Sequence, residues 1–355
     1  MSDRFSQTSA HSISGQNGFD EAALAHWMTA NISGFTGPMT VERFQGGQSN
    51  PTYRLTTPTR SYVMRRKPSG RLVEGAHAIE REVRVMSALR LANFPTPHVY
   101  GLCSDETIIG APFFVMEMVE GRIFWNASLP EVPREERRQY YEAMAATLAS
   151  LHGIDHQELG LSDYGRPNHY VERQIRRWSR QYLADTPEAG RDDGLEKLIE
   201  WLPAHMPDDE QAAIAHGDFR IDNLIFHPRK PQVLAVLDWE LSTIGHPIAD
   251  FAYSLMTYRL PATVIAGLAD TDLKSQGIPS ETEYVKQYCD QRGISVPENL
   301  DYYIAFNLFR LAAIVHGIKG RLARGNAASS HAQRLIEALP IISGIGKGLI
   351  LEHRR

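Results

Sequence analysis

Polar residues crowd two short apolar runs between residues 214 and 242, IAHGDFRIDNLIFHPRKPQVLAVLDWELS: Asp218, Asp222, Asn223, Asp238 and Glu240. An unpartnered buried carboxylate is costly, so a stretch of this kind serves chemistry better than stability. Carboxylate and amide oxygens are hard ligands, and magnesium takes one or two of them together with phosphate and water oxygens. The residue types therefore favour a site for a metal ion bound to a nucleotide.

The apolar runs NLIFH and VLAVLDW, separated by the turn PRKPQ, predict a β-hairpin that positions these groups. Asp218 and Asn223 then lie at the two ends of the loop before the hairpin, and Asp238 ends its second strand. We expect the three side chains to converge.

The rest of the chain changes character near residue 134. Before it, the runs 39–47, 50–58 and 60–68 predict three strands, 76–92 an amphipathic helix and 111–121 an apolar strand. After it, long helical patterns dominate, interrupted by the hairpin. The sequence therefore predicts an α+β protein with a β-rich part followed by a helical part about twice as large.

Composition excludes several classes of function. The 355 residues carry a formal net charge of -5, which argues against a general affinity for nucleic acid or an acidic membrane. The two cysteines, Cys103 and Cys289, predict neither a disulfide framework nor a structural zinc site. The N-terminus lacks the pattern of a secretory signal, and the apolar run 302–318 is read as a core helix. We expect a cytoplasmic protein with a small-molecule partner.

The motifs HGDFRIDN (216–223) and LDWE (237–240), followed by Asp250, resemble the aminoglycoside phosphotransferase and choline kinase-like family. More narrowly, HGDFRIDNLIFHP with VLDWELSTIGHPIADFAY is similar to the kinase domain fused to acyl-CoA dehydrogenases in some multidomain proteins. The resemblance implies a bilobal protein-kinase-like fold. Its expected parts are a tail and short helix (1–35), a nucleotide-binding N-lobe with a small antiparallel sheet and one main helix (36–121), and a mostly helical C-lobe (122–355).

The resemblance also implies roles for single residues. Asp218 is the expected catalytic base, which orients the substrate hydroxyl and accepts its proton. Asn223 and Asp238 are the expected magnesium ligands on ATP, with Glu240 as an auxiliary acidic group. Asp250 is expected to anchor the catalytic loop.

The first lobe should contact the nucleotide. Arg65 is expected on the α- and β-phosphates with Glu82 as its partner, and Lys67 is the alternative for the same role. The remaining residues implied for nucleotide binding are Gly46, Gly47, Ser49 and Asn50 around the phosphates, and Glu117, Met118 and Val119 along the adenine.

The implied activity is transfer of a phosphoryl group from ATP, with magnesium, to a hydroxyl of a small molecule. A hydroxyacyl-CoA or hydroxy acid is the first expectation for the acceptor. The alternatives are an aminoglycoside or macrolide phosphotransferase and a nucleotide-binding pseudokinase that regulates a partner. A basic cluster at Arg310, His316, Lys319, Arg321 and Arg324 is expected to be a solvated helix face, the alternative being an anion pocket, and His246 to be a solvated loop residue.

Overall fold

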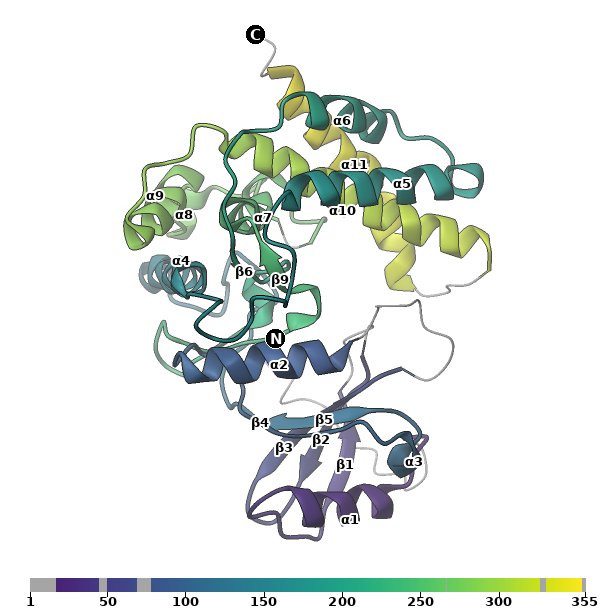
Figure 1. The fold of residues 1–355 in the computed structure, drawn as a ribbon. Helices are drawn as coiled ribbons and strands as arrows, with labels where there is room; N and C mark the ends of the chain where they lie inside the picture. Colours follow the sequence, from purple (N-terminus) through teal and green to yellow (C-terminus); the bar gives the residue numbers. More distant parts are fainter. Residues whose placement is uncertain (1–16, 45–49, 69–77, 266, 326–329, 353–355) are drawn as a thin grey trace. The chain divides into compact units, whose positions relative to one another are not determined.

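The computed structural model describes residues 17–44, 50–68, 78–265, 267–325 and 330–352. A five-stranded antiparallel sheet lies in the N-terminal part, and helices make up most of the rest (Figure 1), which confirms the predicted α+β class. The contacts divide the chain into two compact units. Unit 1 comprises Met1–Arg122, Leu159–Leu161 and Leu224–Leu241, and unit 2 comprises Ile123–Glu158, Ser162–Asn223 and Ser242–Arg355.

The sheet of unit 1 has the strand order β1-β2-β3-β5-β4, with every neighbouring pair antiparallel. Its strands are β1 (Thr40–Arg43), β2 (Thr52–Thr56), β3 (Ser61–Arg66), β4 (Val99–Cys103) and β5 (Phe113–Glu117). The meander of the first three strands agrees with the sequence pattern, whereas β4 was not predicted. Strand β4 is a short run that begins two residues after Pro97. Its first four residues are only partly buried, and Cys103 at its end is buried.

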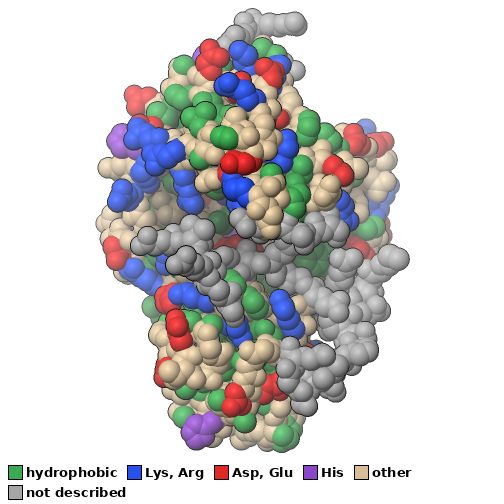
Figure 2. Space-filling view, turned by 90° about the vertical axis from the view of Figure 1, so that its right-hand side faces the viewer, with side chains coloured by type: hydrophobic (Ala, Val, Ile, Leu, Met, Phe, Trp, Pro, Cys, Tyr) green, Lys and Arg blue, Asp and Glu red, His purple; other side chains and the backbone are tan. Residues whose placement is uncertain are grey.

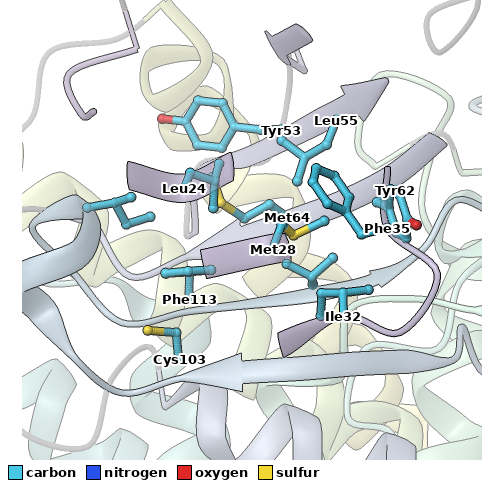
Figure 3. Packing of buried hydrophobic residues seen from close by; sticks show 12 residues of the cluster. Leu24, Met28, Ile32, Phe35, Tyr53, Leu55, Tyr62, Met64, Cys103 and Phe113 are labelled. Atoms are coloured by element: carbon cyan, nitrogen blue, oxygen red, sulfur yellow. The ribbon is translucent and has the colours of Figure 1, made fainter. Parts of the chain in front are cut away.

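Helix α1 (Glu21–Asn31) covers one face of this sheet, and α2 (Ile79–Leu91) lies on the opposite side (Figure 1). The Asp20 carboxylate begins α1 by accepting the backbone N–H groups of Ala22 and Ala23. The apolar cluster beneath α1 contains side chains from the helix and from strands β2 to β5, among them Met28 and Met64 (Figure 3). The short helix α3 (Glu106–Ile109) adds to the same cluster.

Strand alternation decides what the opposite face of the sheet presents. In β3, Tyr62 and Met64 belong to the cluster beneath α1, so Val63 and Arg65 point to the other face. That face meets α2, whose residue Glu82 is buried. The alternation of side chains along β3 therefore places Arg65 on the face that packs against α2, where Glu82 lies.

The predicted hairpin is present as β7 (Leu224–Phe226) and β8 (Val233–Val236). After β8 comes the one-turn helix η3 (Trp239–Leu241), anchored by Trp239, which is 1% exposed and donates from its indole to the Val236 carbonyl at 2.9 Å. Arg122 exchanges two backbone hydrogen bonds of 2.8 Å with Phe226. These bonds join the segment that follows β5 to strand β7 of the hairpin. Asp238 and Glu240 are thus held on a packed support.

Unit 2 is mostly helical, with α10 packed against α5, α7 and α11. Its elements are η1 (Arg134–Glu136), α4 (Arg137–Gly153), α5 (Tyr170–Ala189), α6 (Asp193–Ala204), β6 (Ala213–Ala215), η2 (Ile221–Asn223), β9 (Thr243–Gly245), α7 (Pro247–Arg259), α8 (Leu273–Gln276), α9 (Glu281–Arg292), α10 (Leu300–Ala323) and α11 (Ser330–Glu352). Strand β6 directly precedes the loop that carries Asp218 and pairs antiparallel with β9, which follows η3 in the chain.

The expected core helix at 302–318 lies inside α10, where nearly every residue is buried, Asn307 included. None of the helices in the described ranges is both long and apolar enough to cross a membrane. Charged side chains of both signs lie on the face in Figure 2, with one group of Lys and Arg side chains at its upper left.

Candidate active site

The loop that carries Asp218 is held from below by one buried carboxylate. Asp250, 4% exposed and in the first turn of α7, accepts the backbone N–H of His216 and that of Gly217, each at 2.7 Å. Burial alone would raise the pKa of Asp250, but these hydrogen bonds and the neighbouring His152 outweigh it and lower the pKa. These contacts are the ones expected of a residue that anchors the catalytic loop, which is the role predicted for Asp250.

His152, from α4, completes the anchor. Its Nε2 lies 3.1 Å from Asp250 Oδ2 and its Nδ1 lies 2.7 Å from the Tyr288 hydroxyl. The neutral ring satisfies both contacts when Nε2–H donates to the carboxylate and Nδ1 accepts from the hydroxyl. No motif in the sequence marked His152 or Tyr288, because a single His or Tyr on the buried side of a helix has the appearance of a core residue.

Three side chains surround the carboxylate of Asp218 in unit 2. The Tyr253 hydroxyl donates to Oδ1 at 2.5 Å, and the Asn223 amide donates to Oδ2 at 3.0 Å. The Arg220 Nε lies 3.2 Å from Oδ1, and its Nη2 lies 3.0 Å from Asp222 Oδ2. Asp218 is therefore held in one orientation by hydrogen bonds to both of its carboxylate oxygens.

Asn223 is oriented by the same loop. Its Nδ2 donates to the Asp218 backbone carbonyl at 2.8 Å in addition to the Asp218 carboxylate. A carbonyl can only accept, so this contact fixes which end of the amide is nitrogen. The amide oxygen of Asn223 is then left as a hard ligand for a cation, which fits the expected magnesium role.

Unit 1 holds the second group of predicted residues. The Arg65 guanidinium lies 3.4 Å from Glu82, 2.7 Å from Asp238 and 3.3 Å from Glu240. Asn50, 1% exposed, donates to Glu82 at 3.1 Å. The predicted pair of Arg65 and Glu82 is therefore formed, and Asp238 joins it. Lys67, just after the end of β3, pairs with Glu80 at 2.8 Å instead.

This cluster places three carboxylates around one guanidinium. Burial raises the pKa of Glu82 to about 7, because the opposing charge of Arg65 is offset by the carboxylates of Asp238 and Glu240. Burial would lower the pKa of Arg65, but the three carboxylates raise it. The excess of negative charge fits the addition of a divalent cation beside Asp238.

Asp238 has a backbone conformation that is unusual for its residue type. Its φ is +65°, in the left-handed region, and its side chain is 35% exposed. Left-handed non-glycine residues cost free energy and cluster at functional sites. The residues on either side of Asp238, Leu237 and the buried Trp239, belong to the packed end of the hairpin.

No group of three or more His, Cys, Asp or Glu side chains within the described ranges is arranged to hold a metal ion by itself. Magnesium usually keeps water and phosphate oxygens and needs only one or two protein ligands. Asn223 in unit 2 and Asp238 in unit 1 each carry an oxygen atom of the kind that magnesium takes.

The other predicted nucleotide contacts are less defined. Gly46, Gly47 and Ser49 lie outside the described residues. Glu117 ends β5, and its carboxylate accepts the His98 backbone N–H at 3.1 Å. Met118 and Val119 follow the strand and are partly buried. Their adenine role stays a prediction.

His246 differs from the expectation of a solvated loop residue. It is 4% exposed and begins α7, where Nδ1 accepts the Ala249 backbone N–H at 3.3 Å. Nε2 lies 2.7 Å from the Asp209 carbonyl, and the ring stacks on Tyr303 with centroids 4.8 Å apart. Burial lowers its pKa, which keeps the ring neutral and able to cap the helix.

The basic cluster of α10 is divided rather than being one solvated face. Arg310 and His316 are buried, and His316 Nε2 lies 2.8 Å from the Gly190 carbonyl. Arg324 pairs with Asp185 at 2.8 Å, and Arg321 is exposed. These residues do not form a single anion pocket.

Comparison with known proteins gives the same assignment. The model of the phosphotransferase enzyme family matches residues 40–284. Acyl-CoA dehydrogenase family member 10 of Mus musculus is 46% identical over 301 residues, and member 11 of Gallus gallus is 41% identical over 352 residues. The alignments cover 84% and 96% of this chain but only 28% and 44% of those two proteins.

Solved structures agree on the fold. A crystal structure described provisionally as an aminoglycoside phosphotransferase of Ralstonia eutropha has a TM-score of 0.85 and 42% identity, covering 94% of this chain and 99% of that one. Choline kinase of Cryptosporidium parvum, at 13% identity, shares the fold with a TM-score of 0.62 over 92% of this chain and 98% of its own. The bilobal protein-kinase-like fold is thus confirmed, and the chain belongs to the phosphotransferase enzyme family.

Proposed function

We propose that this chain transfers the γ-phosphoryl group of ATP, with magnesium, to a hydroxyl group of a small molecule. The observation that carries the proposal is the environment of Asp218, which is aimed by Tyr253 and Asn223 on a loop that Asp250 anchors. A base held in one orientation is what phosphoryl transfer requires, since positioning and charge neutralisation supply most of the catalysis.

In the proposed reaction, Asp218 accepts a hydrogen bond from the acceptor hydroxyl and then its proton. The hydroxyl oxygen forms a bond to the γ-phosphorus as the bond between that phosphorus and the β,γ-bridging oxygen breaks, and ADP leaves. Asn223 keeps the Asp218 carboxylate in place through its two hydrogen bonds. The proton of the acceptor hydroxyl is thus transferred to the Asp218 carboxylate and not to bulk water.

For the nucleotide, we assign the phosphate contact to Arg65, which Glu82 orients, and the phosphate loop to Gly46, Gly47, Ser49 and Asn50. We assign the adenine to the backbone of Glu117, Met118 and Val119. Asn223 and Asp238 would hold the magnesium ion, which, when bound, neutralises phosphate charge. The preference for Arg65 over Lys67 rests on their partners, because Lys67 is engaged by Glu80.

For the acceptor, we propose a hydroxy acid or its CoA thioester. Support comes from the names of the relatives, acyl-CoA dehydrogenase family members 10 and 11, of which this chain matches 28% and 44%. Phosphorylation turns a hydroxyl into a better leaving group, which would prepare such a molecule for a later step.

The buried free thiols of Cys103 and Cys289 agree with a reducing, cytoplasmic location.

An antibiotic acceptor is the second candidate. It is favoured by the 42% identical structure described as an aminoglycoside phosphotransferase, which this chain matches over 99% of that chain's length. The two candidates predict different acceptors and the same catalytic residue.

The test measures ADP formation by the purified chain with magnesium and ATP against hydroxyacyl-CoAs, hydroxy acids, aminoglycosides, macrolides and choline. We expect turnover with one class, a loss of about 10²- to 10⁴-fold in Asp218→Asn, and unchanged ATP binding. Asp290→Asn, the same change at an exposed residue of α9, is the control. ATP binding without turnover of any acceptor would support a pseudokinase, and equal activity of Asp218→Asn would refute the role of Asp218.

A further inference from the structure

Behind the catalytic loop of unit 2, two buried side chains from different helices meet. Tyr253, on α7, is 8% exposed, and Arg310, on α10, is 7% exposed. The Arg310 guanidinium carbon lies 5.2 Å from the centre of the Tyr253 ring, and its Nη2 donates to the Gly217 carbonyl. Arg310 thus holds both the loop before Asp218 and the ring whose hydroxyl contacts Asp218.

The two oxygens of Asp218 are used unequally. An ionised carboxylate has about four acceptor positions, two on each oxygen. Among the described residues, Oδ1 receives the Tyr253 hydroxyl at 2.5 Å and lies 3.2 Å from Arg220 Nε, whereas Oδ2 receives only the Asn223 amide at 3.0 Å. Oδ2 is therefore the less occupied of the two oxygens, since Oδ1 has both the Tyr253 hydroxyl and the Arg220 guanidinium beside it.

The Tyr253 hydroxyl is committed to donation. Burial, with the charge of Asp218 next in size, raises the pKa of Tyr253 well above its ordinary value. The phenol therefore keeps its proton throughout the pH range in which the protein is folded. Oδ1 of Asp218 therefore always receives one donor, and a rotation of the carboxylate that moved Oδ1 away from Tyr253 would break this hydrogen bond.

We propose that Tyr253 is a positioning residue that, with Arg310 behind it, occupies Asp218 Oδ1 and so leaves Oδ2 as the atom that receives the acceptor hydroxyl. This inference rests on the proposed function of Asp218 as the base. Tyr253 does not touch the substrate or the nucleotide in this role. Its effect is on the orientation of the carboxylate.

Other charged groups near Asp218 come from several elements and must be held constant in a test. They are Arg220 and Asp222 in the loop and η2, Asp250 on α7, Arg310 on α10, His216 before the loop and Tyr170 on α5. A phenol-to-phenyl change at Tyr253 alters none of these charges.

The test compares Tyr253→Phe with Tyr258→Phe. Tyr258 lies on the same helix, is 8% exposed like Tyr253, and its hydroxyl has no hydrogen-bond partner among the residues that the structure describes. In ADP formation with magnesium, ATP and the acceptor found in the panel, we expect kcat of Tyr253→Phe to fall about 10- to 100-fold, with KM for ATP changed less than about twofold. Equal kcat in both variants would overturn the inference.

A second measurement needs no turnover and separates this inference from the proposed function. The carboxyl carbon of Asp218 is followed by ¹³C NMR in aspartate-labelled protein, its signal assigned by its loss in Asp218→Asn. At neutral pH its chemical shift should change in Tyr253→Phe and stay in place in Tyr258→Phe, because only the first change removes a hydrogen-bond donor from Oδ1. An unchanged chemical shift in Tyr253→Phe would overturn the inference even in an active kinase, whereas absence of turnover in the wild type would count only against the proposed function.

Discussion

Replacing Asp250 by asparagine should destabilise unit 2 far more than a change of one atom type suggests. The carboxylate accepts the backbone N–H groups of His216 and Gly217 and faces Nε2 of His152, all inside the core. An amide has a single acceptor oxygen, so one of the two backbone N–H groups must then face an NH₂ group. That buried donor is left without an acceptor.

The size of the effect follows from these contacts. An unsatisfied buried donor costs about 1–3 kcal/mol, and each remaining hydrogen bond loses about 1 kcal/mol when its acceptor is no longer charged. Asp250→Asn should therefore lower the free energy of unfolding by about 3–5 kcal/mol. The control Asp290→Asn removes only an exposed pair with Lys286 and should cost less than about 1 kcal/mol.

The pH dependence gives the sign of the charge effect. The pKa of Asp250 is lowered in the folded chain, so its contribution is present above the unfolded value of 3.8 and is lost as pH falls through the folded pKa. The difference between wild type and Asp250→Asn should thus be constant from about pH 5 to 8 and shrink below about pH 4. Urea unfolding measures it, and amide exchange of residues 216–223 locates it. A loss below about 1 kcal/mol at neutral pH would refute the reasoning.

Two further predictions concern the cluster in unit 1. Arg65→Ala should weaken ATP binding more than Lys67→Ala, by about tenfold or more in calorimetry, because only Arg65 lies among Glu82, Asp238 and Glu240; similar losses in both variants would contradict the assignment. In the absence of metal and nucleotide, the raised pKa of Glu82, about 7 against 4.5, means that the folded chain binds more protons than the unfolded chain between those values, so stability should fall as pH rises from about 4.5 to 7. Glu82→Gln should flatten that slope, and an unchanged slope would argue against the shift.

The sequence by itself predicted which residues do chemistry. Asp218, Asn223, Asp238 and Asp250 are marked by residue types that a core avoids, at fixed spacing within short segments. The strands 50–58 and 60–68, the helix 76–92 and the helices after residue 134 follow from local periodicity, which the sequence contains in full. The same information misses β4, which is short and only partly buried.

Only the tertiary structure decided which partners hold these residues. Tyr253 is 35 positions from Asp218 and Arg310 is 93 positions from Gly217, so their contacts depend on how α7 and α10 pack. The sequence likewise placed both Arg65 and Lys67 on one strand face, and only the structure shows that Arg65 lies beside Glu82 whereas Lys67 pairs with Glu80. The physical reason is that hydrogen bonds and burial between distant segments are properties of helix and sheet packing, and local sequence patterns do not encode them.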